Sequence, residues 1–308
     1  MVVRPVRSST PWFLPRASSR LRMAWIVALL LGLGLAFAQG PVVDDLGRTV
    51  VLDAPAQRVV AMIPTHTETV CAVGACERLV GVDAFSNYPL EVAALPSLGS
   101  AFDADVEAIV ALEPDLVLTD EYSGLAEALA PLGIPVYAGT AQTIDEIWEI
   151  TREVAQLLGR EDAAALLIGR SQGRLEALTA RAAGRPGPSV FVELDATPYS
   201  VGPSSFLGSL VSRAGGRNVV PAELGDFPQV DPERVIAADP ERVILLDAPY
   251  GESAASVAAR PGWAGIAAVA SGGVIEATMA EVDLLTRAGP RVADALELLM
   301  RWFGTDGR

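Results

Sequence analysis

The sequence is poor in the residues that build metal and redox centres. Its 308 residues include one histidine and two cysteines. A zinc or manganese site needs several histidine or carboxylate ligands, so the lone His66 argues against a metal centre, and we expect no bound cofactor. Aromatic residues make up only 6% of the chain, so the places where they gather are informative.

Positive charge is also scarce. Lysine and arginine together number 23 against 38 acidic residues, which gives a formal net charge of -15. A surface with this excess of negative charge is a poor partner for nucleic acid or for an anionic membrane. Acidic surfaces keep proteins soluble, and they need no specific cationic ligand to explain them. We therefore expect no nucleic-acid partner.

The N-terminal 38 residues have the pattern of a targeting segment. A lead containing five arginines precedes an apolar run from Ala24 to Ala38, which ends in the small-residue pattern Ala36-Phe37-Ala38. This order is typical of a secretory signal peptide. The run is shorter than the roughly 20 residues that cross a bilayer, so an uncleaved anchor is the weaker alternative. We expect cleavage near Ala38 and a soluble, monomeric periplasmic protein.

Short β-branched runs alternate with helical patterns in two parts of the remaining chain. The expected strands of the first part are 58–63, 79–82, 116–118 and 136–137, and its expected helices are 68–73, 106–112 and 125–132. The alternation resumes after Pro188 and ends in a helix over 290–302. Such alternation favours parallel sheets covered by helices. We predict an α/β fold of two lobes, each a mainly parallel sheet flanked by helices.

A long helical pattern separates the two parts. Apolar residues recur at helical spacing from Glu161 to Ala183, a length of roughly 35 Å at 1.5 Å per residue. One long helix should therefore join the lobes and limit their opening and closing. The predicted division is a signal peptide at 1–38, an N-terminal lobe at 39–142, a helical linker at 143–187 and a C-terminal lobe at 188–308.

The two lobes also echo each other in sequence. DVEAIVALEPDLVLTD at 105–120 and DPERVIAADPERVILL at 231–246 align without a gap at an offset of 126. Each reads as a short helix led by an acid, then an acid and a proline, then a strand. Helix, proline and strand in this order are common in α/β chains, but a 16-residue echo favours a duplicated architecture.

The histidine lies in the stretch IPTHTET, just after the expected strand at 58–63. Thr65 and Glu68 have the spacing of a capping box, with Thr65 as N-cap, which would place His66 at the first helical position. Ligands of open α/β sheets bind at this end of the strands. A helix N-terminus also disfavours a charged imidazolium, so we expect a neutral ring. We interpret His66 as lining a cleft, with packing in the core as the alternative.

Two other motifs have plain structural readings. Cys71 and Cys76 are too far apart for a disulfide within one helix, but Gly74 can end the helix between them and allow the bond. Two buried small residues without a disulfide are the equal alternative.

The pattern G-x-S-x-G at 169–173 is typical of a serine hydrolase only where a strand turns into a helix. Here it lies inside a helical pattern, so a secreted hydrolase is a remote alternative.

The loops hold an unusual share of the aromatic residues. Five of them fall after or between expected strands, namely Phe85, Tyr88, Tyr122, Tyr199 and Phe227. Core aromatics would lie within the strands and helices instead. Rings gathered in loops around one cleft indicate a large, flat, partly apolar ligand, although each ring could also serve only to fix its loop.

Six segments in order resemble the periplasmic substrate-binding proteins of cobalamin and ferric-siderophore ABC importers. They begin with RVVAMIPTHTETVCAVGACERLVGVDAFSNYP and LPSLGSAFDADVEAIVALEPDLVL, and the likeness runs from Asp44 to Trp302. The other four are LGIPVYAGTAQTIDEIWEI, FVELDATPYSVGPSSFLGSLVSRAGGRNV, FPQVDPERVIAADPERVILL and DLLTRAGPRVADALELL. The resemblance implies two α/β lobes on a helical backbone, a ligand cleft between them and no catalysis.

Within that group the cobalamin-binding branch is the most similar. Its S-P-x-x-T-E, S-D-Y-P and W-P-Q-V motifs correspond here to IPTHTE, SNYP and FPQV. By this match the corrinoid would be lined by Pro64, Thr65, His66, Thr67, Phe85, Tyr199, Phe227 and Asp283. Two tryptophans of that branch fall on Ala101 and Asp120, which leaves room for a different ligand.

These observations imply a solute-binding protein that delivers a corrinoid or another metal chelate to an importer. The alternative ligand is a ferric siderophore or haem, for which Arg287 is the candidate anion-binding residue. The resemblance also places on Glu107 and Glu233 the two glutamates that pair with arginines of the permease dimer in the inner membrane. Both stand at the start of a short helix, where a carboxylate also suits the helix dipole.

Overall fold

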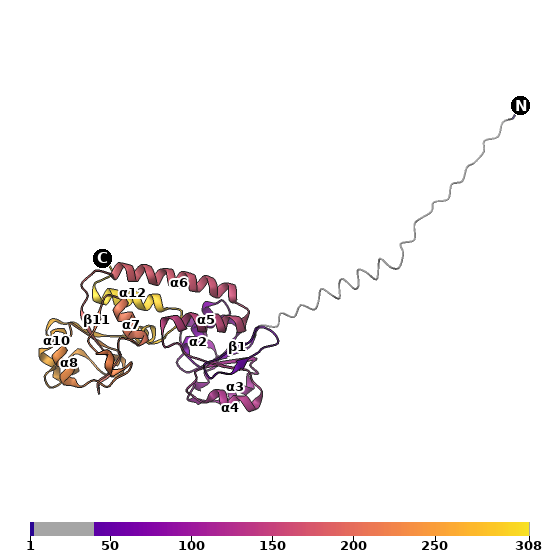
Figure 1. Cartoon of the computed structure of the whole chain (residues 1–308). Helices are drawn as coiled ribbons and strands as arrows, with labels where there is room; N and C mark the ends of the chain where they lie inside the picture. The colour runs from indigo at the N-terminus through magenta and orange to yellow at the C-terminus, as the bar shows by residue number, and fades with distance from the viewer. Residues whose placement is uncertain (3–39, 308) are drawn as a thin grey trace. The chain divides into compact units, whose positions relative to one another are not determined.

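The computed structural model describes residues 1–2 and 40–307, and all contacts below lie in the unit that begins at Gln39 (Figure 1). The predicted signal peptide and its cleavage site, apart from Met1 and Val2, lie outside the described residues. Among the helices of residues 40–307, none is long and apolar enough to cross a membrane.

The N-terminal lobe is built on a four-stranded parallel sheet. Its strands are β3 (Val59–Ala61), β4 (Leu79–Val82), β7 (Leu116–Thr119) and β8 (Val136–Ala138), in the order β4-β3-β7-β8. Almost every strand residue is buried, because each face of the sheet packs on its own hydrophobic core. The surrounding elements are α2 (Pro64–Ala72), α3 (Val106–Ala111), α4 (Leu125–Leu129) and the two-residue strands β1 (Val42–Val43), β2 (Thr49–Val50), β5 (Gly99–Ser100) and β6 (Asp103–Ala104).

The C-terminal lobe repeats this arrangement. Its sheet has the order β10-β9-β12-β13, and β11 pairs with the other end of β9. The strands are β9 (Ser189–Asp195), β10 (Tyr199–Ser200), β11 (Arg217–Asn218), β12 (Arg242–Leu245) and β13 (Val274–Glu276), all parallel except β10. The helices are α7 (Phe206–Arg213), α8 (Pro232–Ala238), α9 (Ala254–Ala259), α10 (Ala267–Ser271), α11 (Met279–Thr286) and α12 (Val292–Phe303).

The echo between the lobes extends to the backbone. Strands β7 and β12 begin at the predicted offset, at Leu116 and Arg242. Among the described residues other than glycine, the two with positive φ are Glu113 (φ 48°) and Asp239 (φ 45°), which stand at the same offset. Each follows a short helix and precedes a proline. A strained turn kept at equivalent positions supports a duplicated architecture.

The linker contains two helices rather than one. α6 (Glu161–Ala182) is the predicted long helix, and α5 (Ile144–Leu158) precedes it. Gly159 ends α5 in the left-handed conformation, which glycine adopts without strain. α6 packs against both α5 and α12 and so lies along both lobes (Figure 1). The G-x-S-x-G pattern lies inside α6 and therefore lacks the strand-to-helix turn of a hydrolase.

The two cysteines are paired. The disulfide joins Cys71, in the last turn of α2, to Cys76, which begins the next short helix. Gly74 takes a positive φ of 75° between them, and the two Cα atoms lie 4.0 Å apart. The helix therefore ends between the cysteines, as the position of this glycine predicts.

A buried cluster of charges joins the two lobes. It connects α2 of the N-terminal lobe to the segment between α11 and α12 of the C-terminal lobe. Glu68 of α2 is 3% exposed, and its carboxylate accepts hydrogen bonds from two arginines of the C-terminal lobe. Arg287 Nη1 lies 2.9 Å from Oε1, and Arg291 binds both oxygens through Nε at 2.7 Å and Nη2 at 2.6 Å. The aromatic ring of Tyr88 lies 4.1 Å from the Arg291 guanidinium carbon. One carboxylate thus connects the lobes.

We expect the Glu68→Ala substitution to destabilise the protein by about 3 to 5 kcal/mol, because it leaves two arginines partly buried without their common partner. Urea denaturation followed by circular dichroism measures this change. Glu91→Ala is the matched control, since Glu91 is an exposed glutamate of the same lobe. A loss for Glu68→Ala no larger than for the control would show that the cluster contributes little to stability.

Candidate ligand-binding site

A cavity of about 430 Å³ lies between the lobes. Each lobe contributes half of the lining. The N-terminal lobe supplies Ile63, Pro64, Thr65, Phe102, Asp120, Tyr122, Thr140, Ala141 and Gln142, and the C-terminal lobe supplies Leu194, Val201, Phe206, Leu207, Phe227, Leu285, Thr286, Arg287 and Ala288. The volume is within the range of small-molecule sites. Several of these residues directly follow strands β3, β7 and β8, where ligands of open α/β sheets bind.

The two walls of the cavity differ in chemistry. The C-terminal wall is mainly apolar, with Leu194, Val201, Phe206, Leu207 and Leu285 as its inner residues. The N-terminal wall carries most of the polar side chains, namely Thr65, Asp120, Thr140 and Gln142. Three rings stand at the cavity with most of their surface exposed: Phe102, Tyr122 and Phe227. A flat apolar ligand with one polar edge would suit such a space.

The structure brings together only part of the aromatic set that the sequence predicted. Tyr122 and Phe227 line the cavity. Phe85 and Tyr199 are exposed, but neither is among the residues that line it. Tyr88 instead stacks on Arg291 beside the disulfide. Phe102 was missed, although it is also a loop aromatic and the same criterion could have found it.

The start of α2 lies two residues earlier than the capping pattern predicts. The N-cap is Ile63, and Pro64 occupies the first helical position. Proline is favoured there because its fixed φ suits a helix and the N–H that it lacks would have no partner within the helix. Thr65 is therefore inside the helix, and the predicted capping box does not form. Pro64 and Thr65 do line the cavity. Thr67 is fully buried and forms a 2.7 Å hydrogen bond with Ser86 Oγ.

His66 is buried beside the cavity and is not one of the residues that line it. Its side chain is 1% exposed, and it lines a small hollow of about 10 Å³ that shares Thr65, Thr140, Ala141 and Ala288 with the cavity, so its role in ligand binding stays a prediction. Its Nε2 atom lies 3.1 Å from the carbonyl oxygen of Thr119, and its ring meets the ring of Tyr137 edge on. Burial lowers the pKa of His66 to about 4, so the ring is neutral as predicted. Burial, and not the helix dipole that the prediction relied on, is the main cause of this shift.

Arg287 lines the cavity, but its guanidinium is already engaged. Nη1 donates to Glu68 Oε1 and Asn87 Oδ1, each at 2.9 Å. Nη2 binds Asp283 Oδ1 at 2.9 Å and the carbonyl oxygen of Phe85 at 3.0 Å. Asp283 also accepts a 2.8 Å hydrogen bond from Asn87 Nδ2. Because these contacts hold both residues in the cluster between the lobes, their first role is to join the lobes.

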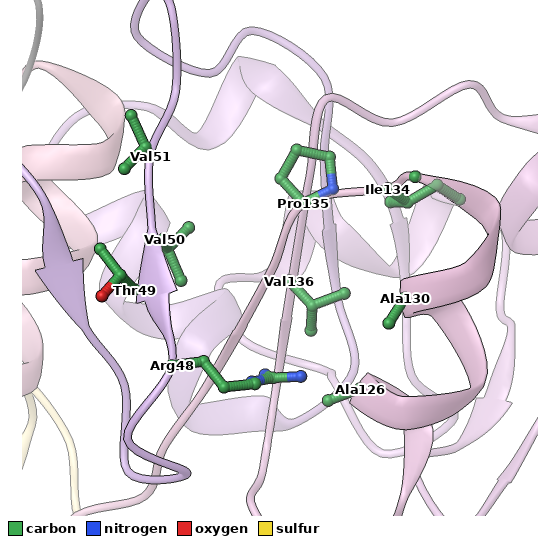
Figure 2. A pocket seen from close by; sticks show the side chains of 10 residues that line it. Arg48, Thr49, Val50, Val51, Ala126, Ala130, Ile134, Pro135 and Val136 are labelled. Atoms are coloured by element: carbon green, nitrogen blue, oxygen red, sulfur yellow. The ribbon is translucent and has the colours of Figure 1, made fainter.

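A second cavity, of about 290 Å³, lies within the N-terminal lobe (Figure 2). Its lining comes from β2, α4 and the start of β8, and Figure 2 shows the Arg48 side chain extending toward Ala126 of α4. Arg48 is paired with Asp44, whose Oδ2 lies 2.6 Å from Nη2. This cavity lies at the amino end of β8, away from the strand ends that bind ligands. The cavity between the lobes is therefore the better candidate.

The described residues contain no group of three or more His, Cys, Asp or Glu side chains arranged to hold a metal ion.

Glu107 and Glu233, the predicted docking residues, are exposed in the first turns of α3 and α8. The preceding aspartates, Asp105 and Asp231, cap these helices through their side chains. Each glutamate is thus presented on the surface at an equivalent position of its lobe.

We expect His66 to make the protein less stable in acid. Its pKa is about 4 in the folded protein and about 6.5 when unfolded, so the unfolded state takes up the proton first. The stabilisation is complete above pH 6.5 and is lost as the pH falls toward 4, by about 3 kcal/mol in total. His66→Gln removes this titration, while the other groups titrate alike in both proteins. The difference in unfolding free energy between them should therefore change between pH 7 and pH 4.5, and a constant difference would contradict the assignment.

Comparison with known proteins agrees with this architecture. Residues 59–280 match the family described as periplasmic binding protein. An uncharacterized ABC transporter substrate-binding lipoprotein of Bacillus subtilis is 28% identical over 267 residues, which cover 83% of this chain and 82% of that protein. A vitamin B12-binding protein of Salmonella typhimurium is 31% identical over 195 residues, covering 62% of this chain and 72% of that one.

Among solved structures, a periplasmic heme-binding protein from Roseiflexus sp. RS-1 in apo form matches with a TM-score of 0.71. It is 27% identical, and the match covers 82% of this chain and 99% of that chain. The family match spans most of the chain and includes both sheets of the fold. The chain therefore belongs to the periplasmic binding protein family.

Proposed function

We propose that this protein captures a corrinoid in the cavity between its lobes and delivers it to an ABC importer in the inner membrane. The observation that carries the proposal is the cavity itself, whose lining is shared equally by the two lobes and includes exposed rings from both. Relatives described as cobalamin-binding or vitamin B12-binding support the choice of ligand. No catalytic step is part of the proposal.

The alternative ligand is a ferric siderophore or haem. The resemblance to a heme-binding protein and the apolar C-terminal wall favour a flat ring of this kind. An anionic siderophore would need arginines free to bind it. The arginine that lines the cavity, Arg287, is instead balanced by Glu68 and Asp283. This balance of charge favours the corrinoid over an anionic chelate.

We expect cyanocobalamin and dicyanocobinamide to bind the purified protein, and Phe227→Ala to weaken binding by roughly tenfold because a stacked ring contributes about 0.5 to 1.5 kcal/mol beyond the area it buries. Isothermal titration calorimetry measures both affinities, with haemin and a ferric catecholate as competing ligands. Tyr250→Ala is the matched control, since Tyr250 is an exposed aromatic of the same lobe outside the cavity. Binding of haemin alone, or of neither corrinoid at high micromolar concentration, would overturn the choice of ligand.

We also propose that Glu107 and Glu233 dock the loaded protein on its permease. Two exposed carboxylates at equivalent positions of the two lobes can each meet one half of a symmetric membrane dimer. Charge pairs of this kind steer association and set the relative orientation of the partners. The helix dipole alone also accounts for a glutamate in the first turn, so a functional test is needed to separate the two roles.

The double substitution Glu107→Ala and Glu233→Ala should leave ligand affinity unchanged and abolish stimulation of ATP hydrolysis by the reconstituted importer. Calorimetry and phosphate release measure the two properties. The matched control replaces Glu161 and Glu176, two exposed glutamates of α6, and removes the same charge. If the docking variant stimulates ATP hydrolysis as well as the control does, the two glutamates serve only their helices.

A further inference from the structure

The aspartate at the end of β7 is the feature of the cavity that the proposed function leaves unexplained. Asp120 directly follows the strand, lines the cavity and is only 5% exposed. Its Oδ1 accepts hydrogen bonds from the backbone N–H groups of Tyr122 at 2.7 Å and Ser123 at 2.6 Å. Its Oδ2 is buried and accepts no hydrogen bond from any residue of the described chain. A buried polar atom without a partner is costly, so each one in a native structure needs an explanation, and a bound ligand would supply one here.

We infer that Asp120 makes the cavity select ligands that present hydrogen-bond donors or positive charge to the N-terminal wall. The inference rests on the proposed function, because it assumes that the ligand occupies this cavity. Beyond the proposed function, it specifies which charge the ligand may carry at this wall and names Asp120 as the residue that selects for it. Ligands that place carboxylates or other anions against this wall are rejected.

The charge balance of the cavity supports this inference. Asp120 and Arg287 are the one acidic and the one basic residue among those that line it. Both Nη groups of Arg287 already donate to acceptors outside the cavity, and two of these acceptors are the carboxylates of Glu68 and Asp283. His66, behind the wall, is neutral because burial lowers its pKa to about 4. The charge of Asp120 is therefore not balanced within the cavity, and a buried charge is weakly screened by salt.

A second group of acids borders the same wall. An adjoining hollow shares Thr140 and Gln142 with the cavity, and its other lining residues include Asp45, Glu121, Glu146, Glu149 and Glu153. No lysine or arginine is among its lining residues. Burial, together with the neighbouring carboxylates, raises the pKa of Asp45 and of Glu153. Because this rim is acidic, it adds to the negative potential that an approaching ligand meets.

The two walls together define how a ligand would lie. Its apolar face would pack on Leu194, Phe206 and Leu207 of the C-terminal wall, and its donor-bearing edge would face Asp120. A planar chelate with amide side chains meets both requirements, since amide N–H groups donate and carry no negative charge. The same ring with carboxylates in place of the amides would set anions against Asp120 and the acidic rim.

The test compares ligands that share a ring and differ mainly in these groups. Dicyanocobinamide carries amides, and dicyanocobyrinic acid carries carboxylates on the same corrin. Haemin and its diamide form a second such pair. Affinities of all four are measured by calorimetry at fixed salt for the wild type, for Asp120→Asn and for Asp53→Asn. Asp53 is an exposed aspartate of the same lobe outside the cavity and controls for the loss of one charge.

For each pair with a ligand that binds, the wild type and Asp53→Asn should bind the amide with an affinity roughly tenfold to hundredfold higher than the carboxylate. This is the range expected for a hydrogen bond to a charged group. Asp120→Asn keeps the acceptor for Tyr122 and Ser123, so it should keep the melting temperature and reduce this preference at least tenfold. An unchanged preference in Asp120→Asn, or a wild-type preference for carboxylates, would overturn the inference while leaving the proposed site intact. If none of the four ligands binds the wild type, the proposed function fails and the inference falls with it.

Discussion

The carboxylate of Glu68 is the contact on which the arrangement of the two lobes depends. It is buried at the junction and is shared by Arg287 and Arg291, which reach it from the opposite lobe. Removing one charged partner from a buried group of this kind costs more than the group contributes as a whole, because the others are left unpaired. The cluster therefore constrains the relative position of the lobes together with α6, which packs along both.

This cluster also affects the charge that the cavity presents. Arg287 borders the ligand space, yet its hydrogen-bond donors are directed to Glu68, Asn87 and Asp283. An arginine used in this way supports the wall but offers little charge to an anionic ligand. The negative charge of Asp120 remains on the opposite side of the cavity. The same ion pairs that join the lobes thus give the site its acidic character.

The regular elements follow closely from local patterns. The strand Leu79–Val82, the helix Glu161–Ala182 and the echo between the lobes were all predicted, because each depends on periodicity within a short segment. The start of α2 was not. A capping box and a first-turn proline compete in IPTHTET, and the structure adopts the proline start at Pro64. Local patterns that allow two starts cannot decide between them without the packing around them.

The candidate site was predictable only in part. Of the predicted residues, the cavity is lined by Pro64, Thr65, Tyr122, Phe227 and Arg287. His66 and Thr67 are buried and do not line it, and neither do Phe85, Tyr88, Tyr199 and Asp283. The residues at strand ends were found because parallel strands place their carboxyl ends together. The apolar wall was missed because Leu194, Phe206 and Leu207 look like ordinary core residues in sequence.

By itself, the sequence determined the fold class, the helix that joins the lobes and the family resemblance, because these depend on periodicity and on the order of segments along the chain. Only the tertiary structure decided which polar groups are free to act. Glu68 and Arg287 are 219 positions apart, and no local pattern reveals that one neutralises the other. Asp120 likewise lines a cavity, and one of its buried oxygens has no partner in the described chain. Both properties arise because distant segments fold around it. Charge pairing and burial are properties of neighbours in space, so the sequence alone could not settle them.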